Sequence, residues 1–190
     1  MLSLTDNSSL IKRGLVCLAL AALAAPAFLP GAKAAAGEIT EFTVKSAYVY
    51  NFIQLVDWPA LDNGAAAGPI RICVIGSAPL GEALAELTGR QVNGRSIQVS
   101  SASAADSGLA DHHIVVIGRA AQDQLPGILK KLEGANILTV GDLPQFARKG
   151  GIIGFINEGG RVKIELNIRA ARKGGLKVSA KLMEVARIIK

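Results

Sequence analysis

Short apolar runs alternate with helix-like segments through the middle of the chain. Four runs, RICVIG, SIQV, HIVVIG and NILTVG, are four to six residues long and lack strict apolar–polar alternation. Runs of this kind are typical of strands buried on both faces. Residues 80–87, 122–132 and 143–149, which lie between or after them, have helix-like spacing. This order predicts an α/β fold, a single domain with a mostly parallel sheet flanked by helices.

The pattern changes in the last third of the chain. Residues 152–157 and 161–168 are two runs separated by Glu158-Gly159-Gly160. In the second run every other residue is aliphatic, and Lys163, Glu165 and Asn167 fill the positions between. This alternation predicts a C-terminal β-hairpin with one solvent-exposed face, which carries the three polar side chains.

A helix is predicted at each end of the domain. Residues 40–58 have apolar positions at three- and four-residue spacing, and Pro59 ends the pattern. Near the C-terminus, Ser179 is a suitable N-cap for a terminal helix that packs back on the sheet. Its predicted apolar stripe consists of Leu182, Val185, Ala186 and Ile189.

The N-terminal segment has the features of an export signal. Lys12 and Arg13 precede an apolar run over residues 14–29, and Ala32-Lys33-Ala34 has the small-x-small pattern of a signal-peptidase site. The run is interrupted by proline and is shorter than the roughly 20 residues of a membrane-spanning helix. We predict that residues 1–34 are a cleaved signal peptide, with cleavage after Ala36 as the alternative, and that residues 35–190 form the mature domain.

Cleavage leaves Cys73 as the only cysteine, within a predicted buried strand. The mature chain therefore has no internal disulfide, although its compartment would permit one. A small buried apolar side chain is the expected role of Cys73, and an intermolecular disulfide is the alternative.

Charge is unevenly distributed along the mature chain. Residues 35–147 carry 7 Lys+Arg and 11 Asp+Glu, whereas residues 148–190 carry 11 and 3. A basic C-terminal segment could face an acidic protein, anionic lipid or cell-wall polymer. Export and the lack of an aromatic–basic platform argue against nucleic acid as a partner.

Motifs for cofactors, metals and catalysis are weak. The turn that begins at Gly76 resembles a phosphate-binding loop, but Glu82 and Ala83 occupy the places of its lysine and hydroxyl, so a tight strand-to-helix turn is predicted. Adjacent His112 and His113 would point to opposite faces of a strand and could not share a metal ion. We expect no cofactor, no metal site and no enzyme activity; a hydrolase around Ser77, Asp111 and His112 is the alternative.

Several blocks of the chain together resemble the YfiR family of exported bacterial proteins, from about Val44 to Ile189. They are KSAYVYNFIQLVDWP, ICVIGSAPLGEAL, GRQVNGRSIQV, HHIVVIG and ILTVGDLPQFARKGGIIGFINEGGRVKIELNIRAARKGGLKVSAKLMEVARI. The resemblance implies a non-catalytic periplasmic regulator that binds and inhibits the periplasmic domain of a membrane-anchored diguanylate cyclase and thereby lowers cyclic di-GMP and biofilm formation. It also implies a homodimer and sequestration by an OmpA-like outer-membrane lipoprotein.

The chain departs from the family at its cysteines. Relatives can pair a cysteine that matches Cys73 with one at the position of His112, and can have a second pair near Ala147 and Gly154. Neither pair can form here, so disulfide stabilisation and redox control are not expected.

The candidate partner-binding residues lie on the hairpin and in the basic segment after it. They are Glu165, Asn167, Arg169, Arg172 and Lys173, together with Arg95, which matches a basic position of the family and is expected to pair with Glu165 or with an anion. For each of them a solvated charged surface is the competing interpretation.

Three functions follow as hypotheses. The first is inhibition of a membrane signalling enzyme, a diguanylate cyclase or another sensor such as a histidine kinase, through a protein–protein interface. The second is a periplasmic binding module for a small molecule or a cell-wall fragment. The third is the hydrolase mentioned above.

Overall fold

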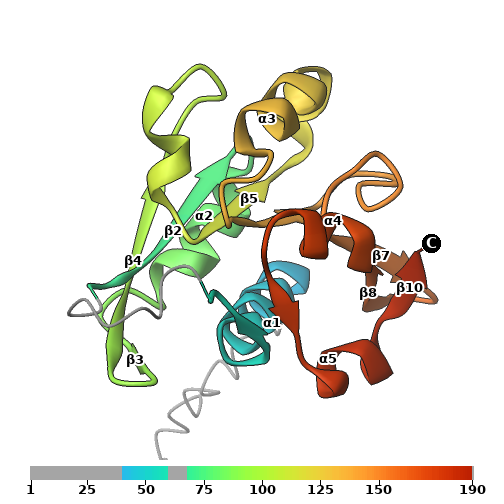
Figure 1. Cartoon of the computed structure of the whole chain (residues 1–190), viewed down its shortest axis with the longest axis horizontal. Helices are drawn as coiled ribbons and strands as arrows, with labels where there is room; N and C mark the ends of the chain where they lie inside the picture. The colour runs from blue at the N-terminus through green and yellow to red at the C-terminus, as the bar shows by residue number, and fades with distance from the viewer. Residues whose placement is uncertain (1–39, 60–67, 190) are drawn as a thin grey trace, which may run out of the picture. The chain divides into compact units, whose positions relative to one another are not determined.

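The computed structural model describes residues 40–59 and 68–189, and the predicted signal peptide lies outside these ranges. Eight strands form one sheet in the order β10-β8-β7-β6-β5-β2-β4-β3, and β1 and β9 form a separate two-stranded ladder (Figure 1). Five neighbouring pairs in the large sheet are parallel, and the β3–β4 and β7–β8 pairs are antiparallel. The predicted α/β class with a mostly parallel, helix-flanked sheet is confirmed.

The elements follow one another along the chain as α1 (Glu41–Leu55), β1 (Val56–Asp57), β2 (Ile70–Ile75), α2 (Ala78–Ala85), β3 (Gln91–Val92), β4 (Arg95–Ser101), η1 (Ser107–Asp111), β5 (Ile114–Ile117), η2 (Arg119–Gln124), α3 (Leu125–Leu132), β6 (Leu138–Gly141), β7 (Ile153–Glu158), β8 (Arg161–Asn167), α4 (Ile168–Lys173), β9 (Lys177–Val178), α5 (Ala180–Val185) and β10 (Arg187–Ile189).

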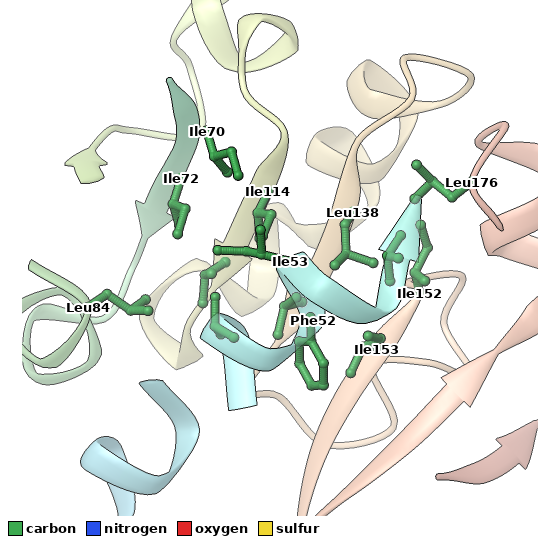
Figure 2. Close-up of a cluster of buried hydrophobic side chains, with 14 of the residues drawn as sticks. Phe52, Ile53, Ile70, Ile72, Leu84, Ile114, Leu138, Ile152, Ile153 and Leu176 are labelled. Carbon is green, nitrogen blue, oxygen red and sulfur yellow. The ribbon is translucent and has the colours of Figure 1, made fainter. Parts of the chain in front are cut away.

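Both faces of the central sheet are buried, as the unbroken apolar runs predict. Along β2, Ile72 and Val74 face one hydrophobic cluster, whereas Cys73 and Ile75 face another. The first cluster includes buried residues of α1 and α2, and Figure 2 shows Phe52 and Ile53 of α1 within it. The second is covered by η1, η2 and α3. Since successive side chains of a strand point to opposite faces, a strand between two layers must be apolar throughout.

Helix α1 begins as predicted but ends early. The Thr40 side chain accepts a hydrogen bond from the Thr43 backbone N–H and caps the helix. The helix ends at Leu55 rather than Trp58, because Val56 and Asp57 are extended and pair with β9. Non-local pairing thus outweighs the helical pattern at this end.

The C-terminal hairpin is confirmed, but its exposed face is only partly so. Strands β7 and β8 pair with Glu158 opposite Arg161, and Gly159 and Gly160 both take positive φ in the turn. The prediction that Glu165 lies on a solvent-exposed face is wrong, since the residue is 5 % exposed. Its cross-strand neighbour Gly154 lies against the backbone of the segment 143–149, which covers this face.

Two predicted helical segments are wrong in part. The C-terminal helix has the predicted Ser179 cap, which accepts from Leu182 N–H, but it ends at Val185. Residues 187–189 instead form β10, parallel to β8, which covers an edge that would otherwise be unpaired. Val185 is 66 % exposed and does not belong to the core.

The predicted helix over residues 143–149 is instead a series of turns. Its Phe146 ring fits between two glycines: a Cβ at Gly141 would lie 2.1 Å from Phe146 Cγ, and one at Gly151 would lie 2.0 Å from Phe146 Cε1. The two glycines therefore provide space for a buried aromatic ring rather than conformational freedom.

Candidate functional site

A short helix places most of the predicted partner-binding residues. The Asn167 Oδ1 accepts from Ala170 N–H at 2.9 Å and caps α4, while its Nδ2 donates to the Ala147 carbonyl at 2.8 Å. Asn167 thereby fixes α4 to the segment 143–149. Arg169, Arg172 and Lys173 of α4 are all exposed.

A cleft of about 510 Å³ lies between α3 and α4. Its polar wall carries Lys130, Lys149, Arg169 and Lys173, and the one carboxylate among its lining residues is Glu133. Lys173 forms an ion pair with Glu133, and its hydrogen bond lowers the pKa of Glu133. With one of its four cations paired, the cleft keeps an excess of positive charge. We call it the basic cleft.

The structure brings together part of the predicted set. Asn167, Arg169 and Lys173 line the basic cleft, whereas Arg172 borders a separate small hollow next to β9. Sequence reasoning missed Lys130 and Lys149, which come from α3 and from the loop before β7. A signal for Lys130 was present in the sequence, because it occupies the last turn of a helix, where cations are favoured.

Glu165 has an internal role. Its carboxylate lies 3.7 Å from Arg187 Nη1 and 4.0 Å from Arg148 Nη2, and both arginines are about half exposed. Glu165 therefore holds two surface arginines from β10 and from the covering segment in position. Its own side chain contributes little to the molecular surface.

Arg95 lies in a different part of the fold. Its strand β4 is separated from β8 by four other strands of the sheet, so the predicted pair with Glu165 is wrong. Instead Arg95 Nε donates to the Gly68 carbonyl at 2.8 Å, and its Nη2 lies 2.8 Å from His113 Nε2.

His113 is buried where β5 begins, and its Nδ1 accepts from the Arg71 backbone N–H at 3.1 Å. Burial, together with the positive charges of Arg95 and Arg71, lowers the pKa of His113 to about 4. The Trp58 ring meets the imidazole edge-on at 6.3 Å between centroids. Trp58, Arg95 and His113 border a second cavity, and Arg95 is the one arginine among the described residues that line it.

The neighbouring His112 has separate contacts. Its Nε2 lies 3.2 Å from Ser100 Oγ and its Nδ1 lies 3.1 Å from the Gly108 carbonyl. The hydrogen-bond partners of the imidazole are thus Ser100 and Gly108, and neither Ser77 nor Asp111 is among them. Among residues 40–59 and 68–189, no group of three or more His, Cys, Asp or Glu side chains is placed to hold a metal ion.

Lys45 is a buried cation that the sequence reasoning did not single out. It is 2 % exposed, and its Nζ lies 2.7 Å from Asp142 Oδ1 and 2.5 Å from Glu41 Oε1. The hydrogen bond from Lys45 is the main cause of a lowered pKa at Glu41. The ion pair joins α1 to the end of β6. Its signal was the position of Lys45 one helical turn before Val49, on the buried face of α1.

Cys73 is free and fully buried, as expected for a small apolar core residue. Burial and the charge of Asp106 raise the pKa of its thiol, a hydrogen bond with Ser100 opposes them, and the resulting pKa is about 11.

Within residues 40–59 and 68–189, no helix combines the length and the apolar character that crossing a bilayer requires.

Comparison with known proteins gives a family and a fold. The model of the YfiR/HmsC-like family matches residues 42–187, whereas no curated protein matches the chain. The structure is similar to a conserved domain protein from Vibrio cholerae O1 biovar eltor, with 11% identity and a TM-score of 0.56 over 80% of this chain and 60% of that one.

A further similar structure is the ABC domain in complex with L-Trp from Streptococcus pneumonia. Its identity is 9% and its TM-score 0.47, over 63% of this chain and 55% of that one. The present chain therefore spans less than two thirds of either protein, and the first of the two likenesses supports the fold alone.

Proposed function

The chain belongs to the YfiR/HmsC-like family, and from this we propose that it is an exported, non-catalytic regulator of a membrane-anchored signalling enzyme. The enzyme is a diguanylate cyclase whose periplasmic domain the regulator binds and holds inactive, which lowers cyclic di-GMP and biofilm formation. The observation that carries the proposal is the family match over residues 42–187. The cleaved signal peptide of residues 1–34, the homodimer and capture by an OmpA-like outer-membrane lipoprotein are parts of the same proposal.

The basic cleft is the surface that we assign to the cyclase. Four cations from α3, the loop before β7 and α4 surround it, and one carboxylate faces them. Exposed charges of one sign favour a partner segment of the opposite sign and guide its approach. We therefore expect an acidic segment of the cyclase's periplasmic domain to lie in the cleft, in contact with Lys130 and Arg169.

Inhibition follows if the regulator binds only the inactive conformation of the cyclase. A ligand shifts a two-state equilibrium by its difference in affinity for the two states, and an excess of about 10⁴-fold moves it from one state to the other. The regulator needs no reactive group for this purpose. Its arginines and lysines contribute through position and charge.

The direct test is coexpression with the cyclase and measurement of cyclic di-GMP. The wild-type chain should lower cyclic di-GMP, and deletion of its gene should raise it. The double variant Lys130→Glu/Arg169→Glu should bind the purified periplasmic domain at least about tenfold more weakly, because two attractive contacts become repulsive. It should also fail to lower cyclic di-GMP.

Lys181→Glu is the matched control, since Lys181 is exposed on α5 and does not line the cleft. It should bind and inhibit like the wild type. Unchanged cyclic di-GMP on deletion of the gene would refute the cyclase as target. Equal binding by the double variant and the control would refute the cleft as the contact surface. Binding that does not weaken with added salt would also contradict it, because contacts between exposed charges are screened.

A further inference from the structure

A second cavity, of about 380 Å³, lies between the end of α1 and the start of β4 and β5. Its apolar wall is formed by Ile53, Val56 and Ile70, all of them buried. Its polar wall is formed by Trp58, Arg95 and His113. We call it the Trp58 cavity. An apolar wall that faces a few polar groups is the usual composition of a small-molecule site.

The hydrogen bonds around His113 leave one donor too many. A neutral imidazole has one N–H and one acceptor nitrogen. Because Nδ1 accepts from the Arg71 backbone N–H, the ring proton is on Nε2. Nε2 in turn lies 2.8 Å from Arg95 Nη2, which is also a donor. Two N–H donors therefore lie next to each other without an acceptor between them, and an acceptor atom placed beside the pair would satisfy both.

Trp58 supplies another donor without an acceptor. Its side chain is 6 % exposed, and the indole Nε1–H has no hydrogen-bond partner among the described residues. An indole nitrogen donates and cannot accept, and a buried donor left unpaired costs free energy. Three donors without a matching acceptor thus belong to residues that line one cavity, and two of these residues, Trp58 and His113, are more than nine-tenths buried.

We propose that the Trp58 cavity binds a small molecule with a carboxylate group and an apolar body. The carboxylate accepts from Arg95, from His113 Nε2–H and from Trp58 Nε1–H, and the apolar body contacts the wall formed by Ile53 and Ile70. This site is independent of the regulatory function proposed above, and it gives the alternative of a small-molecule binding module a location.

A monoanion fits the charge of the site better than a phosphate dianion. Among the described residues that line the cavity, Arg95 is the one permanent cation, and the exposed Asp57 contributes a carboxylate. His113 is neutral at physiological pH, because its pKa is lowered to about 4. A planar carboxylate also matches the fork of an arginine.

The experiment titrates the full chain with cyclohexanecarboxylate, and with cyclohexanecarboxamide as a neutral compound of the same shape. Trp58 is the only tryptophan of the chain, so its fluorescence reports directly on the cavity. We expect a saturable change with the carboxylate, and binding of the amide that is at least about tenfold weaker, because a charged acceptor forms the stronger hydrogen bonds. Calorimetry measures the same affinities without an optical probe, and inorganic phosphate is the third ligand tested.

Arg95→Gln should weaken binding of the carboxylate about tenfold or more, and Trp58→Phe should weaken it about threefold to tenfold in calorimetry. Arg90→Gln is the matched control, since Arg90 is exposed and does not line the cavity, and it should bind like the wild type. Circular dichroism establishes that each variant is folded.

Several results would overturn the proposal. They are equal affinity for carboxylate and amide, binding of phosphate but not of the carboxylate, unchanged affinity in folded Arg95→Gln and Trp58→Phe variants, and no binding up to the solubility limit of the probe.

Discussion

Protonation of His113 should destabilise the fold as the pH falls below neutrality. In the folded chain its pKa is about 4, because the ring is buried next to Arg95 and Arg71, whereas the ordinary value is 6.5. The unfolded chain therefore binds the proton first. The stabilising contribution is fully present above pH 6.5 and is lost as the pH falls towards about 4. With about 1.4 kcal/mol for each pKa unit, the total loss is about 3 kcal/mol.

The window between pH 6.5 and pH 4.5 isolates this group. Glu41 and other carboxylates with lowered pKa values also destabilise the fold in acid, but only when the pH falls through their ordinary value of 4.5. Down to that pH, His113 should account for about 2–3 kcal/mol of lost stability. A domain of this size has a free energy of unfolding of roughly 5–15 kcal/mol, so the chain should remain folded while the loss is measured.

Urea unfolding followed by the fluorescence of Trp58 at a series of pH values measures the effect. The buffers contain no carboxylate, so that the Trp58 cavity stays unliganded. His113→Asn removes the titrating ring but keeps an oxygen that can accept from the Arg71 N–H. The stability difference between the wild type and this variant should shrink by about 2–3 kcal/mol across the window. Lys181→Ala, at an exposed position on α5, is the control and should retain the slope of the wild type.

The result that would refute this reasoning is the same slope for wild type and His113→Asn between pH 6.5 and pH 4.5. It would mean that the ring takes up its proton in the folded chain near its ordinary pKa, with solvent close to it. The argument for a neutral His113 that donates through Nε2 would then fail as well.

Three further predictions concern the core. Lys45→Ala leaves a buried carboxylate unpaired and should lower the free energy of unfolding by about 3–5 kcal/mol in urea, whereas Lys181→Ala on the surface should change it by less than about 0.5 kcal/mol. Gly151→Ala forces a methyl group against the Phe146 ring and should lower the free energy of unfolding by about 1–3 kcal/mol. Gly127 lies on α3 with open space around it, so Gly127→Ala should raise the free energy of unfolding by up to about 1 kcal/mol. Cys73 should not react with a maleimide in the native state, but should react once urea unfolds the chain, and mass spectrometry measures the labelling. Rapid labelling of the native chain would contradict the burial of Cys73 and its raised pKa.

The parts of the fold that the sequence predicts correctly depend on local pattern. Strand β5 consists of four consecutive apolar residues, as a strand that is buried on both faces requires. The β7–β8 turn is Gly159-Gly160, and both residues take the positive φ that a two-residue hairpin turn requires. In these segments the information lies within a few residues of the element itself.

Two of the wrong predictions involve a partner from elsewhere in the chain. Residues 187–189 have a helical pattern, yet pairing with β8 makes them a strand. Glu165 occupies a polar position of an alternating strand, yet the segment 143–149 and Arg187 cover it. Periodicity shows that a strand has two different faces, but it does not show what will later pack on the polar one.

In both candidate sites the sequence indicated some of the residues, and only the fold shows which others lie next to them. The charge of the C-terminal segment pointed to Arg169 and Lys173, but the cleft exists only because α3 brings Lys130 to the opposite wall. The Trp58 cavity joins residues of α1, of β4 and of the segment before β5, and its evidence is a mismatch of donors that only atomic positions reveal. Arg95 was singled out from the sequence with an anion as one of two possible partners, and its neighbours in the fold favour the anion over Glu165.

The β1–β9 ladder connects the surroundings of the two sites. Val56 and Asp57, which border the Trp58 cavity, pair with Val178 and Lys177 of the strand that follows α4. A ligand that moves Val56 or Asp57 would therefore also displace β9, which is joined to α4 by only three residues. Binding free energies are reciprocal, so if a carboxylate changes the affinity for the partner through this ladder, the partner must change the affinity for the carboxylate by the same factor. Measuring each affinity with and without the other ligand therefore tests the connection twice.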